Sequence, residues 1–249
     1  MEYGLEVLKE ELQCASEAIH YTKDILIIVH DQLDFVKICI DSIQRNTQNY
    51  NIFLWDNGSY PPTADYLKEL ADTHGNIFLH REEENIGFIE PNNRLAEMTA
   101  SPYIVLLNSD TKVYSGWDLA MTGWLQKHPE VAQVGYHGGW LNSQGKGVRF
   151  GFGGDVQYIC GYCFCIPRAT YEEFGLFDET NLEFAYFEDS DYSLRLQEAG
   201  KKIYALNVRL VHHFENRTVK QVIKEKDISP YLSKNSLYIQ SRWRDQLNG

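Results

Sequence analysis

Apolar runs without a polar residue alternate with helix-like segments over the first 110 residues. Runs at residues 25–29, 52–55, 77–79 and 103–107 have the length of strands, and such continuous runs are typical of strands buried on both faces of a parallel sheet. A helix is predicted over about 63–71 between two of them. Strands that alternate with helices predict right-handed crossovers in one sheet. The predicted fold class is therefore α/β, a single domain with a mostly parallel central sheet flanked by helices.

Polar residues follow three of these apolar runs. His30 follows the first run, Asp56 the second, and Asn108-Ser109-Asp110 the fourth. Because the carboxyl ends of parallel strands lie on one edge of a sheet, where open α/β sheets bind ligands, we expect these residues to converge on one crevice. A carboxylate there can hold a divalent cation on the phosphates of a nucleotide, and another can accept hydrogen bonds from a base or ribose. The alternative for each is an ordinary turn, since Asn, Ser and Asp are frequent turn formers.

A loop with a helix behind it lies between the third and fourth apolar runs. Asn85 and Gly87 are in this loop, and Pro91 suits the first turn of the helix that follows. The free N–H groups and the positive dipole end of a helix attract phosphate. A surface loop and helix without a ligand is the alternative.

Three carboxylates, Glu188, Asp189 and Asp191, lie within four residues at the predicted start of a helix that ends at Gly200. Helix capping and the helix dipole explain part of this clustering. A carboxylate fixed at the lip of a pocket can also take the proton of an attacking hydroxyl. The residues alone leave both interpretations open.

Two histidines, His212 and His213, end the apolar run at residues 206–211. Imidazole is a suitable ligand for manganese. Alternate residues of an extended chain face opposite ways, so only one of the pair can point inward. A surface pair without a ligand is the alternative.

Composition excludes some classes of function. A net charge of −12 argues against a nucleic-acid partner, and no run approaches the roughly 18 apolar residues of a transmembrane segment. Five cysteines, an odd number, favour reduced thiols and a cytoplasmic location. Cys160, Cys163 and Cys165 are close enough to suggest zinc, but no second ligand pair sits at metal spacing. Small buried side chains on a strand are the favoured interpretation.

A set of short motifs resembles the inverting family-two glycosyltransferases with the GT-A fold, from about residue 25 to 213. The motifs are, in order, VHDQLD, DNGS, NIGF, LNSDT, GYCFCIPRATYEEFGLFDE, FEDSDYSLRLQEAG and VHH. The resemblance implies a Rossmann-like GT-A sheet, a nucleotide-sugar donor and a divalent metal, Mn²⁺ or Mg²⁺. It also implies direct displacement of the nucleoside diphosphate by an acceptor hydroxyl.

The resemblance assigns roles to individual residues. Asp189 matches the catalytic base, and Asp110 with His212 matches the metal ligands, with His213 as the alternative to His212. Asn108 stands where the metal motif has its first aspartate, so one fewer negative charge predicts weak metal affinity without the donor. The residues that match substrate-binding positions are Val29, His30, Asp56, Asn85, Gly87, Asn93, Asn108, Ser109, Glu188 and Asp191.

Domain boundaries follow from the same patterns. Residues 1–22 are predicted to form an amphipathic lead-in helix, and 23–219 the GT-A domain. The nucleotide-binding half of the domain runs to about residue 112, and the acceptor and catalytic half follows. Residues 220–249 form a helical tail, whose abrupt end is compatible with a module of a larger glycosyltransferase.

Specific positions within these parts are also predicted. The glycine-rich residues 137–154 are too irregular to assign and long enough to form a mobile segment over a site. The residues expected on the apolar faces of the lead-in and tail helices are Leu5, Leu8, Leu12, Ala15, Ile19, Leu232, Leu237, Ile239 and Trp243.

The expected function is metal-dependent transfer of a sugar from a UDP- or dTDP-sugar to a hydroxyl of a glycan or other acceptor, as in polysaccharide biosynthesis. Two alternatives are a nucleotide-sugar-binding module without turnover and a nucleotidyltransferase. The second normally has a glycine-rich phosphate loop with basic residues after the first strand. VHDQLD has neither glycine nor lysine, so this alternative ranks last.

Overall fold

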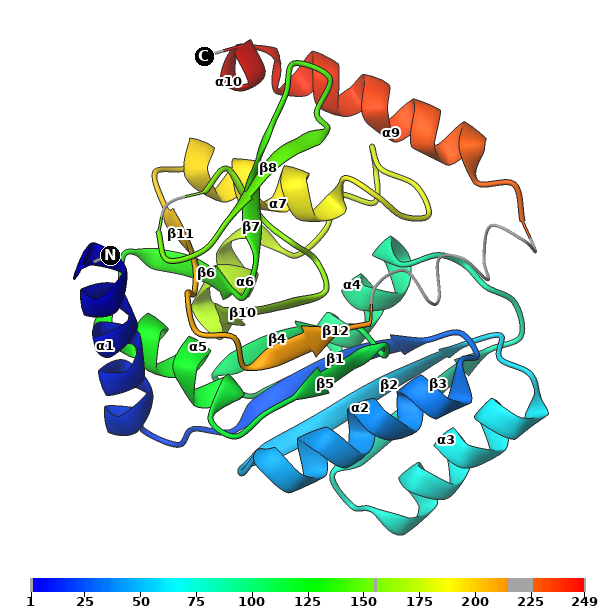
Figure 1. Cartoon of the computed structure of the whole chain (residues 1–249). Helices are drawn as coiled ribbons and strands as arrows, with labels where there is room; N and C mark the ends of the chain where they lie inside the picture. Colours follow the sequence, from blue (N-terminus) through cyan, green and yellow to red (C-terminus); the bar gives the residue numbers. More distant parts are fainter. Residues whose placement is uncertain (1, 155, 215–225, 249) are drawn as a thin grey trace.

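A seven-stranded sheet forms the centre of the protein in the computed structural model, which describes residues 2–154, 156–214 and 226–248 (Figure 1). The strands run in the spatial order β11-β6-β10-β4-β1-β2-β3. β10 is antiparallel to both of its neighbours, and the other pairs are parallel. The bounds are β1 (Lys23–Val29), β2 (Tyr50–Asn57), β3 (Ile77–Glu82), β4 (Tyr103–Leu107), β6 (Val131–Gly135), β10 (Cys163–Pro167) and β11 (Lys202–Ala205). The predicted α/β class with a mostly parallel sheet is confirmed.

Helices cover both faces of this sheet and enclose two apolar cores. Side chains of β1 alternate between them: Ile25 and Ile27 lie in one core, and Leu26 and Ile28 lie in the other. The first core also contains residues of α2 (Leu33–Asn46), α3 (Pro61–Thr73) and α5 (Trp117–Lys127). The second contains residues of α4 (Ile89–Glu97) and α7 (Glu188–Glu198), and α6 (Arg168–Phe174) packs beside it. Burial on both faces explains why the strands have no polar interruption.

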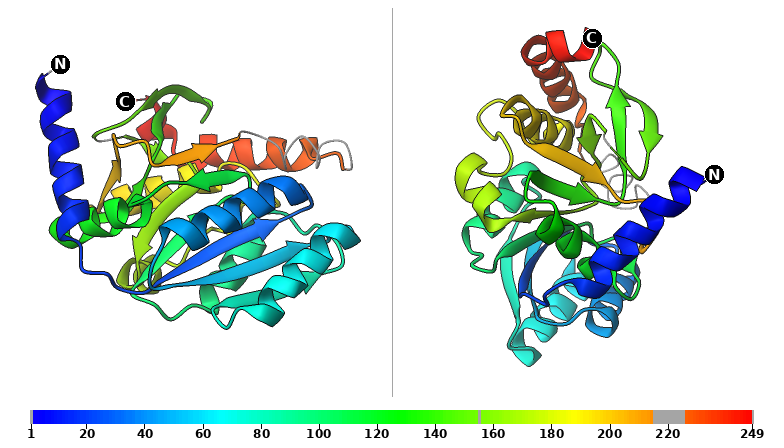
Figure 2. Two further views of the ribbon diagram at one scale, coloured as in Figure 1. Left: turned by 60° about the horizontal axis from the view of Figure 1, so that its bottom comes forward. Right: turned by 90° about the vertical axis from the view of Figure 1, so that its left-hand side faces the viewer.

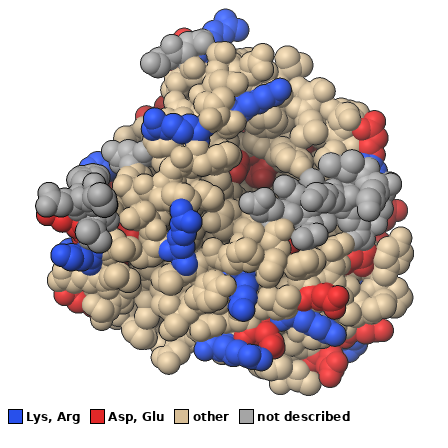
Figure 3. Space-filling model, viewed as in Figure 1, with Lys and Arg blue, Asp and Glu red and all other residues tan. Residues whose placement is uncertain are grey.

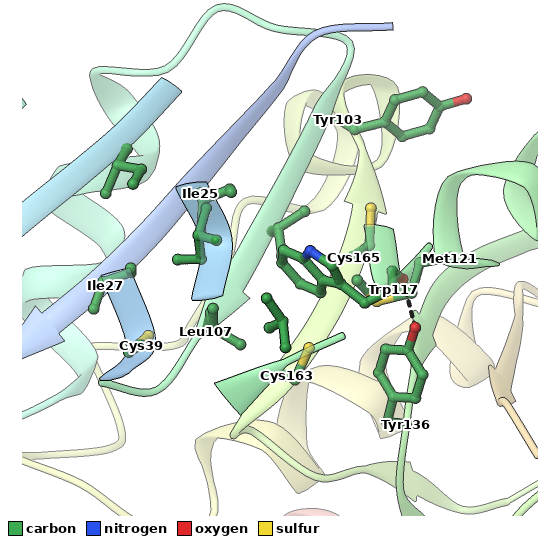
Figure 4. Packing of buried hydrophobic residues seen from close by; sticks show 14 of the residues in the cluster. Ile25, Ile27, Cys39, Tyr103, Leu107, Trp117, Met121, Tyr136, Cys163 and Cys165 are labelled. Carbon is green, nitrogen blue, oxygen red and sulfur yellow. Dashed lines mark hydrogen bonds between the residues drawn. The ribbon is translucent and has the colours of Figure 1, made fainter. Parts of the chain in front are cut away.

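Two of the clustered cysteines, Cys163 and Cys165, are fully buried on β10 and point into the first core (Figure 4). Their neighbours there include Trp117, whose carbonyl oxygen accepts a hydrogen bond from the hydroxyl of Tyr136. Burial raises the pKa of Cys163 and of Cys165. Both therefore act as small apolar side chains of a strand, as the sequence favoured.

The glycine-rich segment forms a hairpin rather than an irregular loop. β7 (Gly138–Leu141) pairs with β8 (Gly147–Gly151) and with β9 (Tyr158–Ile159) in a small antiparallel sheet. The guanidinium carbon of Arg149 lies 3.6 Å from the centre of the Trp140 ring. A second small sheet pairs β5 (Thr111–Val113) with β12 (Val211–His213).

The N-terminal helix α1 (Glu2–Glu17) runs beside α5 (Figure 2), and its predicted residues Leu8 and Ala15 pack against the first core. The side chain of Leu5 lies outside the described residues. Leu12 and Ile19 are 51% and 59% exposed, whereas Glu11 is fully buried. The Glu11 carboxylate accepts hydrogen bonds from the backbone N–H groups of Asn207, at 2.8 Å, and Val208, at 2.9 Å. Glu11 thus provides a buried acceptor for two backbone donors that would otherwise lack one, on the same side of the helix as Leu8.

The C-terminal helices α9 (Ser229–Arg242) and α10 (Arg244–Asn248) lie against α7 and the hairpin. Ile239 and Trp243 are fully buried, as predicted, but Leu237 is 67% exposed because it lies on the opposite side of the helix. Residues 220–225 of the predicted tail lie outside the described residues. No helix in the described ranges has the length and apolar character required to cross a bilayer.

Candidate functional site

A cavity of about 600 Å³ opens at the carboxyl edge of the central sheet. Figure 3 shows acidic side chains inside a hollow on this face of the molecule. The cavity brings together residues that the sequence predicted from widely separated positions. The predicted residues that line it are His30, Asn85, Gly87, Asn108, Ser109, Glu188, Asp189 and His213.

One wall is held by Asn57, a residue that the sequence analysis did not select. Its amide nitrogen donates to the Asn85 side-chain oxygen at 2.9 Å and to the Gly87 carbonyl at 2.7 Å. Its own backbone carbonyl lies 2.9 Å from Nδ1 of His30. The side chain is buried, so this network fixes the loop after β3 against the end of β1.

Gly87 has a steric reason to be glycine. Its φ of +103° is unfavourable for other residues, and a Cβ would lie 2.5 Å from the carbonyl oxygen of Phe184. The same oxygen accepts hydrogen bonds from the backbone N–H groups of Phe88, at 2.5 Å, and Ile89, at 3.2 Å. The loop after β3 and the segment before α7 are therefore in direct backbone contact where both line the cavity.

The polar residues after β4 provide acceptor atoms near one another. Oδ1 of Asn108 is buried and has no hydrogen-bond partner among the described residues. Ser109 is buried at the cavity wall. Oδ1 of Asp110 lies 3.0 Å from Nε2 of His213.

His213, not His212, faces the cavity. Antiparallel pairing of β12 with β5 places His213 opposite Thr111 and His212 opposite Lys112. The His213 ring stacks on Tyr162 at 4.7 Å between ring centres, whereas His212 is exposed and packs against Phe214. The expected inward orientation of His212 is therefore wrong, because the strand register decides which histidine points inward.

The side chains of Asp110, His213 and Asn108 are of the types that bind a hard divalent cation, whose remaining ligands would come from a bound molecule. Asp110 supplies a carboxylate, His213 an imidazole, and Asn108 an amide oxygen without a partner. The described part of the chain contains no group of three or more His, Cys, Asp and Glu side chains that could hold a metal by themselves.

Asp189 lines the same cavity from the first turn of α7. Its Oδ2 accepts a hydrogen bond from the Gly161 N–H at 2.9 Å, and its Oδ1 accepts one from the Ser190 N–H at 2.7 Å. Burial raises the pKa of Asp189 despite these hydrogen bonds. The carboxylate is thus fixed in place and destabilised as an anion, which favours proton uptake.

Glu188 lies beside Asp189 and also lines the cavity. Its Oε2 is buried without a hydrogen-bond partner in the described residues. Burial and the neighbouring Asp189 carboxylate raise the pKa of Glu188 to about 8. Two adjacent acids therefore line the cavity. The Asp189 carboxylate accepts two backbone hydrogen bonds, whereas Oε2 of Glu188 has no partner in the described residues.

Asp191 points away from the cavity. Its Oδ2 accepts a hydrogen bond from Nε of Arg195 at 2.9 Å, and its Oδ1 accepts one from Nε1 of Trp243 at 2.9 Å. The residue is fully buried and joins α7 to the C-terminal helices. Asp191 therefore connects two helices and does not line the cavity.

Besides His212 and Asp191, four predicted residues lie outside the cavity lining. One is Asp110, which contacts the lining residue His213. Val29 is fully buried in the first core. Asp56 is fully buried, accepts the Ser59 N–H at 2.9 Å and forms an ion pair with Arg81. Asn93 donates to the Phe177 carbonyl at 2.9 Å and accepts from the Phe177 N–H at 2.9 Å, which anchors a loop on the far side of α4.

Aromatic residues that the sequence analysis did not select make up much of the cavity wall. They are Phe88, Phe150, Tyr162, Phe184, Tyr186 and Phe187. Phe150 and Tyr186 remain 60% and 36% exposed. The run FAYF immediately before the acidic cluster is the one local signal for them, since exposed aromatic residues beside candidate catalytic groups often contact ligands.

Comparisons with known proteins identify a family and a fold. The profile of glycosyl transferase family 2 matches residues 24–172, a range that ends before α7 and β12. The crystal structure of GalNAc-T7 with UDP, GalNAc and Mn²⁺ is similar, with a TM-score of 0.75, 16% identity, and coverage of 92% of this chain and 49% of that one. The mannosyltransferase PcManGT from Pyrobaculum calidifontis, in complex with GDP-Man and Mn²⁺, has a TM-score of 0.62, 14% identity and coverage of 95% and 77%.

The chain spans about half the length of GalNAc-T7. At these identities the two structures establish a shared fold. A search of curated protein sequences found no match.

Proposed function

Because the chain belongs to glycosyl transferase family 2, we propose that it transfers a sugar from a nucleotide-sugar donor to an acceptor hydroxyl, with inversion at the anomeric carbon. One observation carries the proposal. A half-buried carboxylate, Asp189, and the residues Asn108 and His213 line the same cavity, and His213 contacts Asp110. A base and a candidate diphosphate site are the two parts that a direct displacement requires.

The donor is proposed to lie along the wall formed by His30, Asn85 and Gly87, with its diphosphate toward Asp110 and His213. Mn²⁺ or Mg²⁺ held there would neutralise the charge that develops on the departing nucleoside diphosphate. The two similar structures contain Mn²⁺ together with UDP in one and GDP-Man in the other. UDP- and dTDP-sugars are the proposed donors, as the sequence suggested. Asp56, the carboxylate expected to accept the imide N–H of uracil or thymine, is buried and paired with Arg81, so it would have to leave this ion pair to bind the base.

Asp189 is proposed to accept the proton of the acceptor hydroxyl. The hydroxyl oxygen forms a bond with the anomeric carbon while the bond from that carbon to the diphosphate oxygen breaks, and the electron pair leaves with the diphosphate. One displacement inverts the configuration. Burial of Asp189 strengthens it as a base, because its raised pKa increases the affinity for the transferred proton.

The acceptor is proposed to be a glycan. Aromatic rings can cover the apolar C–H faces of a sugar while neighbouring polar groups bind its hydroxyls. Phe150 and Tyr186 offer such rings in the cavity that Asp189 also lines. Polysaccharide biosynthesis is the process in which we expect such a transfer. The protein is proposed to act without a nucleic-acid partner.

The proposal is tested first by thermal unfolding with UDP-, dTDP-, GDP- and CMP-sugars, each with Mn²⁺ and with a chelator. A ligand at 100 times its Kd stabilises the native state by about 2.7 kcal/mol. For a chain of this length that raises Tm by about 5–10 °C. We expect this shift with one class of nucleotide and only in the presence of Mn²⁺.

The outcomes of this panel separate the candidate functions. A shift followed by transfer to an acceptor supports the proposal. A shift without hydrolysis or transfer of the bound donor would identify a binding module without turnover. No shift with any nucleotide sugar, for folded protein, contradicts the donor site.

Phe150→Ala tests the acceptor wall. We expect KM for a glycan acceptor to rise about 5- to 10-fold, because one ring contact in a pocket contributes on the order of 1 kcal/mol. Donor affinity should not change. Val148→Ala is the matched control, since Val148 lies on the same strand, is similarly exposed and does not line the cavity. Equal effects of the two substitutions on acceptor KM would remove Phe150 from the acceptor site.

A further inference from the structure

The segment before α7 has an unusual backbone conformation. Phe184, Tyr186 and Phe187 have φ values of 63°, 76° and 71°. Residues other than glycine rarely adopt this left-handed conformation, and three within four positions require support from the surrounding structure. All three residues line the cavity, and Glu188 and Asp189 follow directly.

Three side chains of the C-terminal helix α9 contact this segment: Tyr231 stacks on Phe184, Lys234 forms an ion pair with Glu183, and Asn235 binds the backbone itself. Asn235 on α9 is fully buried. Its Nδ2 donates hydrogen bonds to the carbonyl oxygens of Glu183 at 2.8 Å, Ala185 at 3.0 Å and Tyr186 at 3.2 Å. Its Oδ1 accepts a hydrogen bond from the Glu183 N–H at 3.0 Å. The amide thus takes the place of the backbone partners that the left-handed residues cannot find in a regular element.

The same segment is held from its other side by the loop after β3. The Phe184 carbonyl accepts the N–H groups of Phe88 and Ile89, and Gly87 packs against it. The segment therefore lies between the proposed donor wall and α9. Its carbonyl groups are divided between these two supports, so loss of either support frees part of the backbone that leads to Asp189.

We propose that Asn235 is a positioning residue, which holds the 183–187 segment so that Asp189 is aimed into the cavity. The inference rests on the proposed role of Asp189 as the base. Asn235 lies outside the range matched by the family profile, residues 24–172. Asparagine is suited to this position because it offers two N–H donors and an acceptor in one planar group, whereas aspartate of the same shape has no N–H group.

Asn235→Ala and Asn235→Asp test the proposal. Aspartate directs an oxygen at three carbonyl oxygens, and alanine leaves them without a donor. We expect kcat to fall about 100-fold in both variants, because a displacement of roughly 1 Å at a catalytic group has that effect. Donor affinity measured with Mn²⁺ should change less than about twofold. Amide hydrogen exchange of residues 184–189 should become faster.

A control of matched stability distinguishes positioning from general destabilisation. Leu70→Ala removes a buried side chain from α3, which packs in the first core away from the cavity lining. Assays are made at the same distance below each variant's Tm. A kcat for Asn235→Ala equal to that of Leu70→Ala, with unchanged exchange of residues 184–189, would overturn the proposal.

Failure of the proposed function gives a different result. If the wild-type protein binds and transfers no nucleotide sugar, the role of Asp189 fails in that measurement. Hydrogen exchange alone then tests whether Asn235 orders residues 183–187. Faster exchange of residues 184–189 in Asn235→Ala supports this ordering, and unchanged exchange overturns it.

Discussion

Asp189→Asn is expected to lower kcat about 1000-fold while the protein still binds its donor in the presence of Mn²⁺. A general base contributes roughly 10²- to 10⁴-fold to rate, and asparagine has the same shape but cannot take up the proton. The side-chain oxygen of asparagine can still accept the Gly161 N–H, so the start of α7 should keep its structure. Steady-state transfer assays and donor titration by calorimetry measure the two quantities separately.

The pH profile of the wild-type protein provides a second test of Asp189. Because burial raises the pKa of Asp189, the wild-type kcat/KM should rise with pH along an acid limb that lies above the ordinary titration range of aspartate. The same profile is measured for Glu188→Gln, which changes the acid next to Asp189. Glu198→Gln is the control, since Glu198 lies at the far end of α7. Glu198→Gln should keep normal turnover. Near-normal kcat in Asp189→Asn would remove Asp189 from the mechanism.

Asp110→Ala and His213→Ala are expected to lower donor affinity about 100- to 1000-fold in Mn²⁺, with little change in a chelator. Removing a ligand that holds a cation on a diphosphate costs several kcal/mol, and each 1.4 kcal/mol corresponds to a factor of ten. The Asp110–His213 contact of 3.0 Å places both residues at the same point of the site. Donor titrations with Mn²⁺ and with a chelator measure the effect.

His212→Ala is the matched control for the metal site. It removes an imidazole from the neighbouring position, but His212 is exposed and faces away from Asp110. Donor affinity in this variant should equal that of the wild type. A loss as large as in His213→Ala would contradict the strand register, and an equal loss for Asp110→Ala in a chelator would indicate a role in folding instead.

Local patterns were sufficient to predict β1 to β4 of the central sheet, but not β11, because the apolar run at residues 206–211 follows that strand rather than forming it. The strands around residues 25–29 and 103–107 have uninterrupted apolar runs because both faces of each strand meet a core. The polar residues at the ends of β1 and β4 also meet as expected, because parallel strands bring their carboxyl ends to one edge. His30, Asn108 and Ser109 all line the cavity for this reason.

Contacts between distant residues could not be predicted in the same way. Alternation along a strand shows that one histidine of a pair points inward, but pairing with β5 selects His213. Asp56 was expected to face a base, and its pairing with Arg81, 25 residues later, has no local signature. Asn235 was missed because a polar residue on a helix gives no sign of the loop that it will bind.

The hydrogen bonds from Asn235 to the segment before α7 also bear on the order in which the site forms during translation. The first four parallel strands, with the wall around His30 and Gly87, are encoded before residue 108. They can pair soon after they leave the ribosome, since the N-terminal part of a chain generally folds first. The amide that orders the segment leading to Asp189 emerges more than 120 residues later. A nascent chain can therefore assemble its donor wall well before the proposed base is in place, which delays turnover until translation has passed residue 235.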